Sequence, residues 1–130
     1  MSISDSKKRL AFDVLAVVQA TLIAAISLVS IGLPAIQREL GLDEAQLTLV
    51  AAGYGLAFCG LLILGGRLGD VYGPGRAFTV GLSLFGLASL GGAVATSATL
   101  LLTARFAQGI GASLAAPAAL TLAGNLYDDP

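Results

Sequence analysis

The chain has 130 residues and a mass of 13.0 kDa, with 56% hydrophobic and only 12% charged residues. Soluble domains average roughly 25% charged residues, and a mean hydropathy of +0.88 excludes both a water-soluble globule and a disordered chain. Seven Lys and Arg against eight Asp and Glu give a net charge of −1, which excludes a basic surface for nucleic acid. With no histidine and one cysteine, the sequence predicts no disulfide framework and no His/Cys metal site.

Uncharged runs between clusters of charge predict four membrane-spanning helices. About 20 apolar residues cross roughly 30 Å of hydrocarbon, and continuous rather than alternating runs favour helices over strands. The sequence therefore predicts an all-α membrane protein in which four transmembrane helices form one unit over residues 14–123. The predicted spans are residues 14–33, 47–64, 77–94 and 100–123.

Local signals indicate where these helices end. We expect Pro34 to close the first span, and the spacing of Asp43 and Gln46 resembles a capping box that opens the second helix. Five glycines within residues 65–76 predict a short loop with a tight return between the second and third helices. Pro74 suits the first turn of the third helix, where its missing N–H costs nothing.

Basic residues predict the orientation, because they favour the cytoplasmic flanks of spans. One side holds Lys7, Lys8, Arg9, Arg67 and Arg76, and the other holds Arg38 alone. We therefore expect a multi-pass protein of the plasma (inner) membrane. Residues 1–13 would form a cytoplasmic amino-terminal segment, and residues 124–130 would begin a cytoplasmic loop. A signal peptide is the alternative for the first span, but this run exceeds a typical h-region and three more spans follow.

The glycine-rich stretch contains one acid, Asp70, between two arginines. Its carboxylate can accept hydrogen bonds from a helix start and pair with a guanidinium. The alternative is a flexible turn with solvated charges, since exposed ion pairs contribute only ~0–1 kcal/mol.

The same stretch resembles the signature between the second and third helices of the major facilitator superfamily. The matching residues are Gly66, Leu68, Asp70, Gly73 and Arg76. The resemblance implies the first part of that family's helical bundle and a conformational latch at this loop. Val71, Pro74 and Gly75 stand where the family commonly has basic residues, which leaves the latch with less positive charge.

The fourth span carries a polar face. Arg105, Gly109 and Ser113 recur at i, i+4 and i+8, with Gln108 beside them. A charge at membrane depth is expensive and normally faces protein or water, so we expect Arg105 to be buried and functional. The alternative is that Arg105 snorkels to the outer interface. The stretch also resembles the fourth-helix signature of the same superfamily, an arginine two residues before Ala-Gln-Gly.

The first two spans supply further candidates for a transport path. Gln19, Ser27 and Ser30 share one face of the first span. Either they bond to helix carbonyls and bridge helices, or they line a substrate cavity. Tyr54 in the second span resembles a family position and is also a candidate.

Residues 31–37 resemble the end of the first helix in the fourteen-helix drug–proton antiporter branch, the multidrug efflux branch of the superfamily. That branch has an acid, a threonine and an asparagine upstream, where this chain has Ala25, Ser27 and Ser30. The four predicted spans contain no Asp or Glu, so no residue in them is assigned to proton coupling.

These resemblances imply an amino-terminal fragment of a secondary active transporter that exports small molecules or drugs by alternating access. We expect no enzyme activity, catalytic residue, metal or cofactor. The implied partners are the lipid bilayer, a small-molecule substrate and the remaining helices of the transporter. Two alternatives remain: a small four-helix exporter acting as a dimer, whose first span would need an acid, and a non-transporting membrane subunit.

Overall fold

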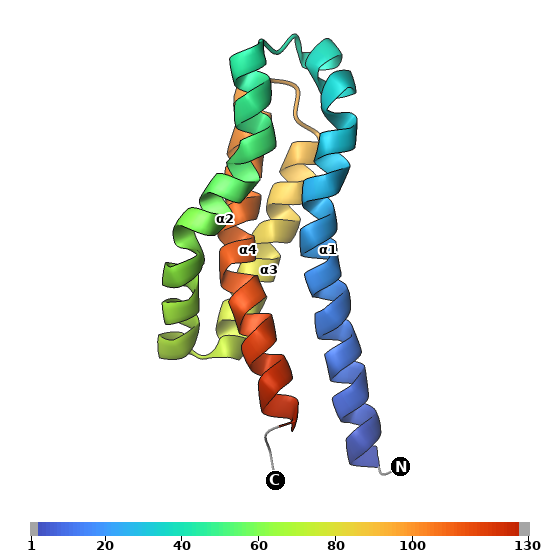
Figure 1. Ribbon diagram of the computed structural model, residues 1–130, viewed down its shortest axis with the longest axis vertical. Coiled ribbons are helices and arrows are strands. Elements are labelled where there is room, and N and C mark those ends of the chain that lie inside the picture. The colour runs from blue at the N-terminus through green and yellow to red at the C-terminus, as the bar shows by residue number, and fades with distance from the viewer. Residues whose placement is uncertain (1–2, 128–130) are drawn as a thin grey trace.

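The computed structural model describes residues 3–127, except for the side chains of Ile3 and Ile26, and consists there of four α-helices (Figure 1). Their bounds are Ile3–Leu40 (α1), Glu44–Tyr72 (α2), Pro74–Ala93 (α3) and Ala98–Tyr127 (α4). Each is long and apolar enough to cross a membrane, which confirms the predicted all-α fold with four such helices. Residues 1–2 and 128–130 of the predicted terminal segments lie outside the described residues.

Two of the predicted helix boundaries are confirmed and one is wrong. The capping box of α2 is present, because Gln46 N donates to Asp43 Oδ1 at 2.7 Å and Asp43 N donates to Gln46 Oε1 at 3.1 Å. Pro74 occupies the first turn of α3. Pro34, however, lies inside α1, which continues to Leu40. Membrane helices tolerate an internal proline because their surroundings can satisfy the freed backbone groups.

The stretch predicted as a glycine-rich loop is helical almost throughout. Helix α2 continues to Tyr72, and Gly73 alone links it to α3, with a φ of +95° that L side chains rarely adopt. The preceding glycines serve close packing instead: a Cβ on Gly65 would overlap the backbone carbonyl of Ser113 on α4. The loop prediction is wrong because glycine in a membrane helix also allows two backbones to approach.

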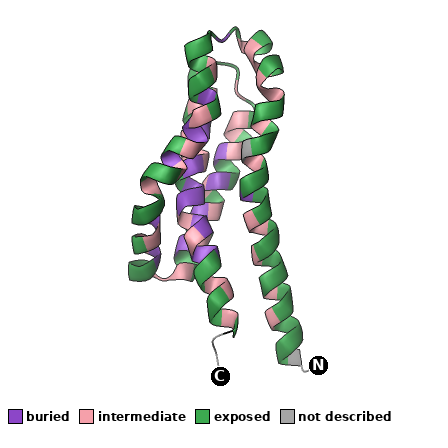
Figure 2. Cartoon of the chain, viewed as in Figure 1, coloured by how far each residue is buried: buried purple, intermediate pink, exposed green. Residues whose placement is uncertain are grey.

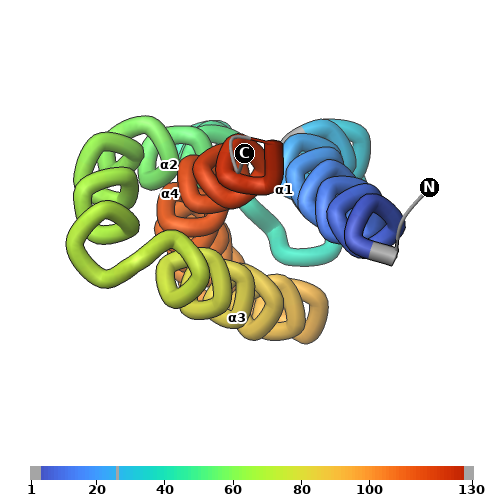
Figure 3. The backbone as a smooth tube through the Cα atoms, turned by 90° about the horizontal axis from the view of Figure 1, so that it is seen from below, coloured from blue at the N-terminus to red at the C-terminus, as the bar shows by residue number. Residues whose placement is uncertain are grey.

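Helix α4 lies at the centre of the arrangement, with the other three helices around it (Figures 1 and 3). Burial follows this arrangement, since buried residues gather on α4 and the helices beside it while α1 is mostly exposed (Figure 2). In the most apolar stretch of α4, 44% of residues are buried, against 6% in α1. Apart from the polar face that holds Arg105 and Gln108, α4 is apolar, and such a helix is typically enclosed by other helices.

Small residues allow α4 to lie close to its neighbours. Gly111 faces Gly81 where α4 meets α3, and a Cβ on either glycine would lie 2.6 Å from the carbonyl oxygen of the other. Gly109 packs in the same way against the backbone of Tyr54 on α2. The buried alanines of α4 are Ala104, Ala112, Ala115, Ala116, Ala118 and Ala119. Because lipid provides no hydrophobic drive for helix association, such close packing holds the bundle together.

The connections alternate between the two ends of the bundle. The α1–α2 and α3–α4 connections lie at one end, and the α2–α3 turn lies at the other, together with the start of α1 and the end of α4 (Figure 1). This is the arrangement expected for four successive membrane crossings. The basic residues at the start of α1 and around the α2–α3 turn therefore share one end of the molecule.

Candidate functional site

A buried arginine lies where α2 and α4 meet. Arg105 is 2% exposed. Its Nε donates to the backbone oxygen of Val50 on α2 at 3.3 Å, and its Nη1 donates to Gln108 Oε1 at 2.9 Å. The guanidinium carbon lies 5.1 Å from the centroid of the Tyr54 ring, within the range of a cation–π interaction. The side chain therefore points into the bundle and does not snorkel to the interface.

A chain of polar groups extends from this arginine to α3. Gln108 Nε2 donates to Ser89 Oγ at 2.9 Å, and Ser89 Oγ donates to the backbone oxygen of Phe85 at 2.8 Å. Ser89 does not stand out in the sequence, because a single hydroxyl in an apolar helix usually bonds only to its own backbone. The available signal was its position in the same half of the membrane as Gln108, on the preceding antiparallel span.

Tyr54 joins the arginine to the remaining helices. It is 2% exposed, and its hydroxyl donates to the backbone oxygen of Leu22 on α1 at 3.1 Å. Its ring stacks against Phe58 with centroids 6.1 Å apart and meets Phe85 of α3 edge-on at 6.3 Å. Both are favourable aromatic arrangements. Tyr54, one of the transport-path candidates of the sequence, thus contacts α1, α3 and α4 from its position on α2.

One nitrogen of the guanidinium has no hydrogen-bond partner within the described part of the chain. Arg105 Nη2 is buried and has no hydrogen-bond partner among the described residues. No Asp or Glu occurs in the predicted spans to neutralise the charge. Burying a cation without a counter-ion is costly, and the carbonyl, amide and ring contacts of Arg105 offset only part of that cost. The open donor suits an acceptor such as water, a carboxylate or a carbonyl oxygen.

The other polar candidates on α4 and α1 divide into two groups. Gly109 and Ser113 are buried on α4, and Ser113 Oγ donates to the backbone oxygen of Ile110 at 2.7 Å. Gln19 on α1 lines a cavity of about 140 Å³ beside α4, where its Oε1 is buried without a partner among the described residues. Ser27 and Ser30 are exposed on α1. Gln108 and Tyr54 therefore contact Arg105, whereas Gln19 lies beside Ala119 and Ala123 farther along α4, and the four helices do not enclose the two serines.

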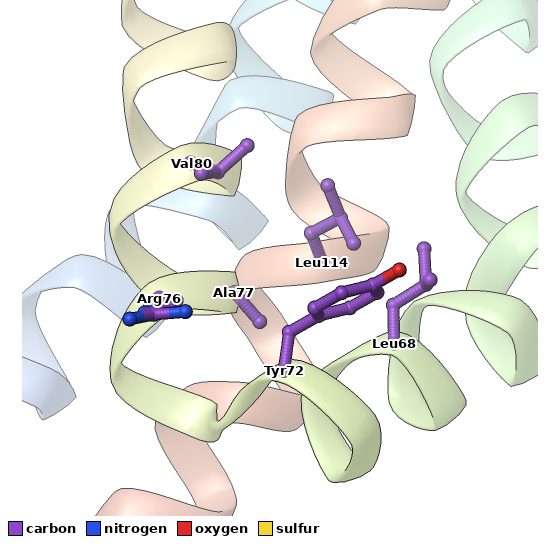
Figure 4. A pocket seen from close by; sticks show the side chains of 6 residues that line it. All are labelled: Leu68, Tyr72, Arg76, Ala77, Val80 and Leu114. Carbon is purple, nitrogen blue, oxygen red and sulfur yellow. The ribbon is translucent and has the colours of Figure 1, made fainter.

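The five predicted latch residues lie around the α2–α3 turn. Asp70 is exposed, and its side chain has no hydrogen bond or ion pair with another described residue. Gly66 faces open space, because a Cβ there would meet no atom within 4 Å. Leu68 and Arg76 line an apolar pocket of about 310 Å³ with Tyr72, Ala77, Val80 and Leu114 (Figure 4). The carboxylate of Asp70 is thus open to a partner outside the described residues.

The fold and this buried polar site define a multi-pass α-helical membrane protein. Residues 15–130 match the family model of the Major Facilitator Superfamily, and the chain belongs to that family. This confirms the resemblance drawn from the second-to-third helix turn and the fourth helix.

Several relatives are named for drug resistance or export. The chain is 46% identical over 104 residues to the puromycin resistance protein pur8 of Streptomyces alboniger, covering 80% of this chain and 21% of that protein. It is 46% identical over 96 residues to the cephamycin export protein CmcT of Amycolatopsis lactamdurans, covering 74% of this chain and 20% of that protein. It is 43% identical over 108 residues to the lincomycin resistance protein of Streptomyces lincolnensis, covering 83% of this chain and 22% of that protein. The chain spans about a fifth of the length of these curated relatives.

Proposed function

We propose that this chain forms the amino-terminal four helices of a secondary active transporter that exports drug-like small molecules by alternating access. The family supports this function over an enzyme, since its members are generally transporters. Relatives named for puromycin and lincomycin resistance and for cephamycin export support the direction and the substrate class. The observation that carries the proposal is Arg105, a buried charge in a membrane-length helix with one donor unused. Intramembrane charges of this kind mark transport pathways.

In this proposal Arg105 Nη2 donates a hydrogen bond to an oxygen of the substrate or of a water molecule in the transport path. Tyr54 and Gln108 hold the guanidinium in one plane, because they contact its face and one of its edges. Gly109 and Ser113 keep the same face of α4 free of bulky side chains.

The remaining candidates act where this chain meets the rest of the transporter. Gln19, Ser27 and Ser30 extend the polar path once the remaining helices cover α1. Gly66, Leu68, Asp70, Gly73 and Arg76 form the conformational latch. Its exposed carboxylate at Asp70 pairs with a segment outside these four helices.

The test joins this chain to the remaining helices of the puromycin resistance protein and follows puromycin uptake into inverted vesicles, normalised to inserted protein. We expect uptake by the chimera, impaired uptake by Arg105→Lys and none by Arg105→Ala. An ammonium cannot replace the planar fork of a guanidinium, whose separate donors reach Val50 and Gln108. Arg67→Lys is the matched control, because Arg67 is exposed at the end of α2. Unimpaired uptake by Arg105→Ala would remove this residue from the site, and an inserted chimera without uptake would contradict the function.

The proposed location is the plasma membrane with a cytoplasmic amino terminus. A reporter fused after Gly41 or after Ser97 should be external, and a reporter fused after Gly73 should be cytoplasmic, because five of six flanking basic residues share the latter side. External labelling of the Gly73 fusion would overturn the orientation.

A further inference from the structure

Donors and acceptors alternate along the hydrogen-bonded chain that joins α4 to α3. The guanidinium of Arg105 has only donors, so the amide of Gln108 must present Oε1 to Arg105 Nη1, at 2.9 Å. The amide nitrogen Nε2 then faces Ser89 Oγ, also at 2.9 Å. The hydroxyl of Ser89 donates to the backbone oxygen of Phe85 at 2.8 Å, which leaves its lone pairs to accept from Nε2.

The orientation of the Gln108 amide depends on Ser89. The two arms of an amide have nearly the same shape, so packing alone does not distinguish Oε1 from Nε2. Ser89 does distinguish them, because its hydroxyl donates its proton to Phe85 and offers Gln108 only lone pairs. Without Ser89 Oγ, the amide nitrogen would lose the acceptor that the structure gives it, and Gln108 could turn away from Arg105.

The amide of Gln108 in turn fixes the guanidinium of Arg105. The Nε atom donates to the backbone oxygen of Val50 at 3.3 Å, but this bond alone permits a half-turn about the Cζ–Nε bond, which exchanges Nη1 with Nη2. The bond from Nη1 to Gln108 opposes that rotation, because it would have to break first. It thereby holds Nη1 in place and leaves Nη2 as the buried nitrogen with no partner among the described residues.

We propose that Ser89 is a positioning residue of the export site. It holds Gln108, and through Gln108 the guanidinium of Arg105, in the orientation that presents Nη2 to the substrate. This role rests on the proposed function, in which Arg105 lies on the transport path. The two helices are close together here, since a Cβ on Gly92 of α3 would lie 3.5 Å from the Cβ of Ala104 on α4. This packing keeps Ser89 within reach of Gln108.

The orientation is tested on the 130-residue chain in detergent by 15N nuclear magnetic resonance of labelled arginine side chains. The measured quantity is the rate at which Nη1 and Nη2 of Arg105 exchange. We expect Ser89→Ala to raise this rate about tenfold, because the guanidinium loses a fixed acceptor. Ser89→Thr keeps the hydroxyl and should keep the parent rate. Ser83→Ala is the matched control, since Ser83 is exposed on the same helix, and equal rates in the two alanine variants would overturn the proposal.

The variant Gln108→Glu separates the orientation of the amide from helix packing. A carboxylate presents an oxygen on both arms, so Arg105 keeps an acceptor whether or not Ser89 is present. In this background Ser89→Ala should change the exchange rate by less than about twofold. An effect as large as in the parent background would mean that Ser89 acts by packing α3 against α4, and it would overturn the positioning role.

The consequence for transport is tested in the chimera with the remaining helices of the puromycin resistance protein. Ser89→Ala should raise the KM for puromycin uptake about fivefold and leave kcat nearly unchanged, because it weakens a contact that holds the bound substrate. Ser83→Ala should match the parent chimera. A chimera without uptake would contradict the proposed function and the role of Ser89 with it. Uptake by the parent chimera with an unchanged KM in Ser89→Ala would overturn the role of Ser89 alone.

Discussion

Helices α1 and α4 are both long and apolar but have very different surroundings. Both are membrane-length, with 38 and 30 residues, and both contain an internal proline. The apolar stretch of α1 is the more hydrophobic of the two, yet it is the less buried. Its large exposed side chains include Val17, Ile23, Leu28 and Ile31, whereas glycine, alanine and serine dominate the buried positions of α4.

Within these four helices, burial follows residue size more closely than hydropathy. Lipid is as apolar as leucine, so a leucine-rich helix gains little by leaving it. A helix of small residues gains dispersion contacts, because its backbone can approach its neighbours closely.

Gly111→Ala should destabilise the bundle most, by about 3 kcal/mol. A Cβ at this position would lie 2.6 Å from Gly81 O and 2.7 Å from Phe85 N, so the α3 and α4 backbones would have to separate. Reversible unfolding by SDS in mixed micelles, followed by circular dichroism, measures the change. Gly86→Ala is the matched control, because a Cβ there meets no atom within 4 Å. Similar midpoints for the two variants would refute the close crossing.

Tyr54→Phe should loosen α1 specifically, at a cost of about 1 kcal/mol. The substitution keeps the ring contacts with Phe58 and Phe85 but removes the hydroxyl that donates to Leu22 O. Hydrogen exchange should accelerate in α1 and remain slow in α4. Tyr72→Phe, at a position 62% exposed, is the control and should change neither helix. Faster exchange throughout the bundle would mean that α1 is not a separable unit.

Arg105→Met should change the stability of the four-helix chain by no more than about 1 kcal/mol in either direction. The methionine loses the hydrogen bonds to Val50 and Gln108 but also removes a buried charge without a counter-ion. SDS unfolding of the chain measures this balance. A loss of several kcal/mol would make Arg105 a structural cross-link and weaken its assignment to a transport path.

Ser27→Leu should have the smallest effect, below about 0.5 kcal/mol, because Ser27 is exposed on α1. Leu22→Ser on the same helix is the contrasting variant, since Leu22 is 3% exposed and belongs to the buried core. The same unfolding assay compares them. If Ser27→Leu proved as disruptive as Leu22→Ser, the face that α1 presents to α2 and α4 would be wrongly assigned.

The class of the fold and much of its framework follow from the linear pattern of residues. Clusters of charged residues mark the ends of the spans, because a charge within hydrocarbon is costly. The capping box forms through hydrogen bonds between Asp43 and Gln46, which are three residues apart. Helical periodicity also placed Arg105, Gly109 and Ser113 on one buried face of α4. These features depend on neighbours along the chain or on the membrane, so a linear pattern is enough to predict them.

Which side chains meet depends on how the helices pack. The sequence does not show that Gly65 packs against α4 rather than forming a loop, that Ser89 ends the polar chain from Arg105, or that the Tyr54 hydroxyl reaches α1. It likewise does not show that Ser27 and Ser30 are exposed while Gln19 faces α4. Each of these depends on the rotation and depth of one helix relative to another. That register is decided by how closely two backbones can approach, and the two sides of each contact lie far apart in the sequence.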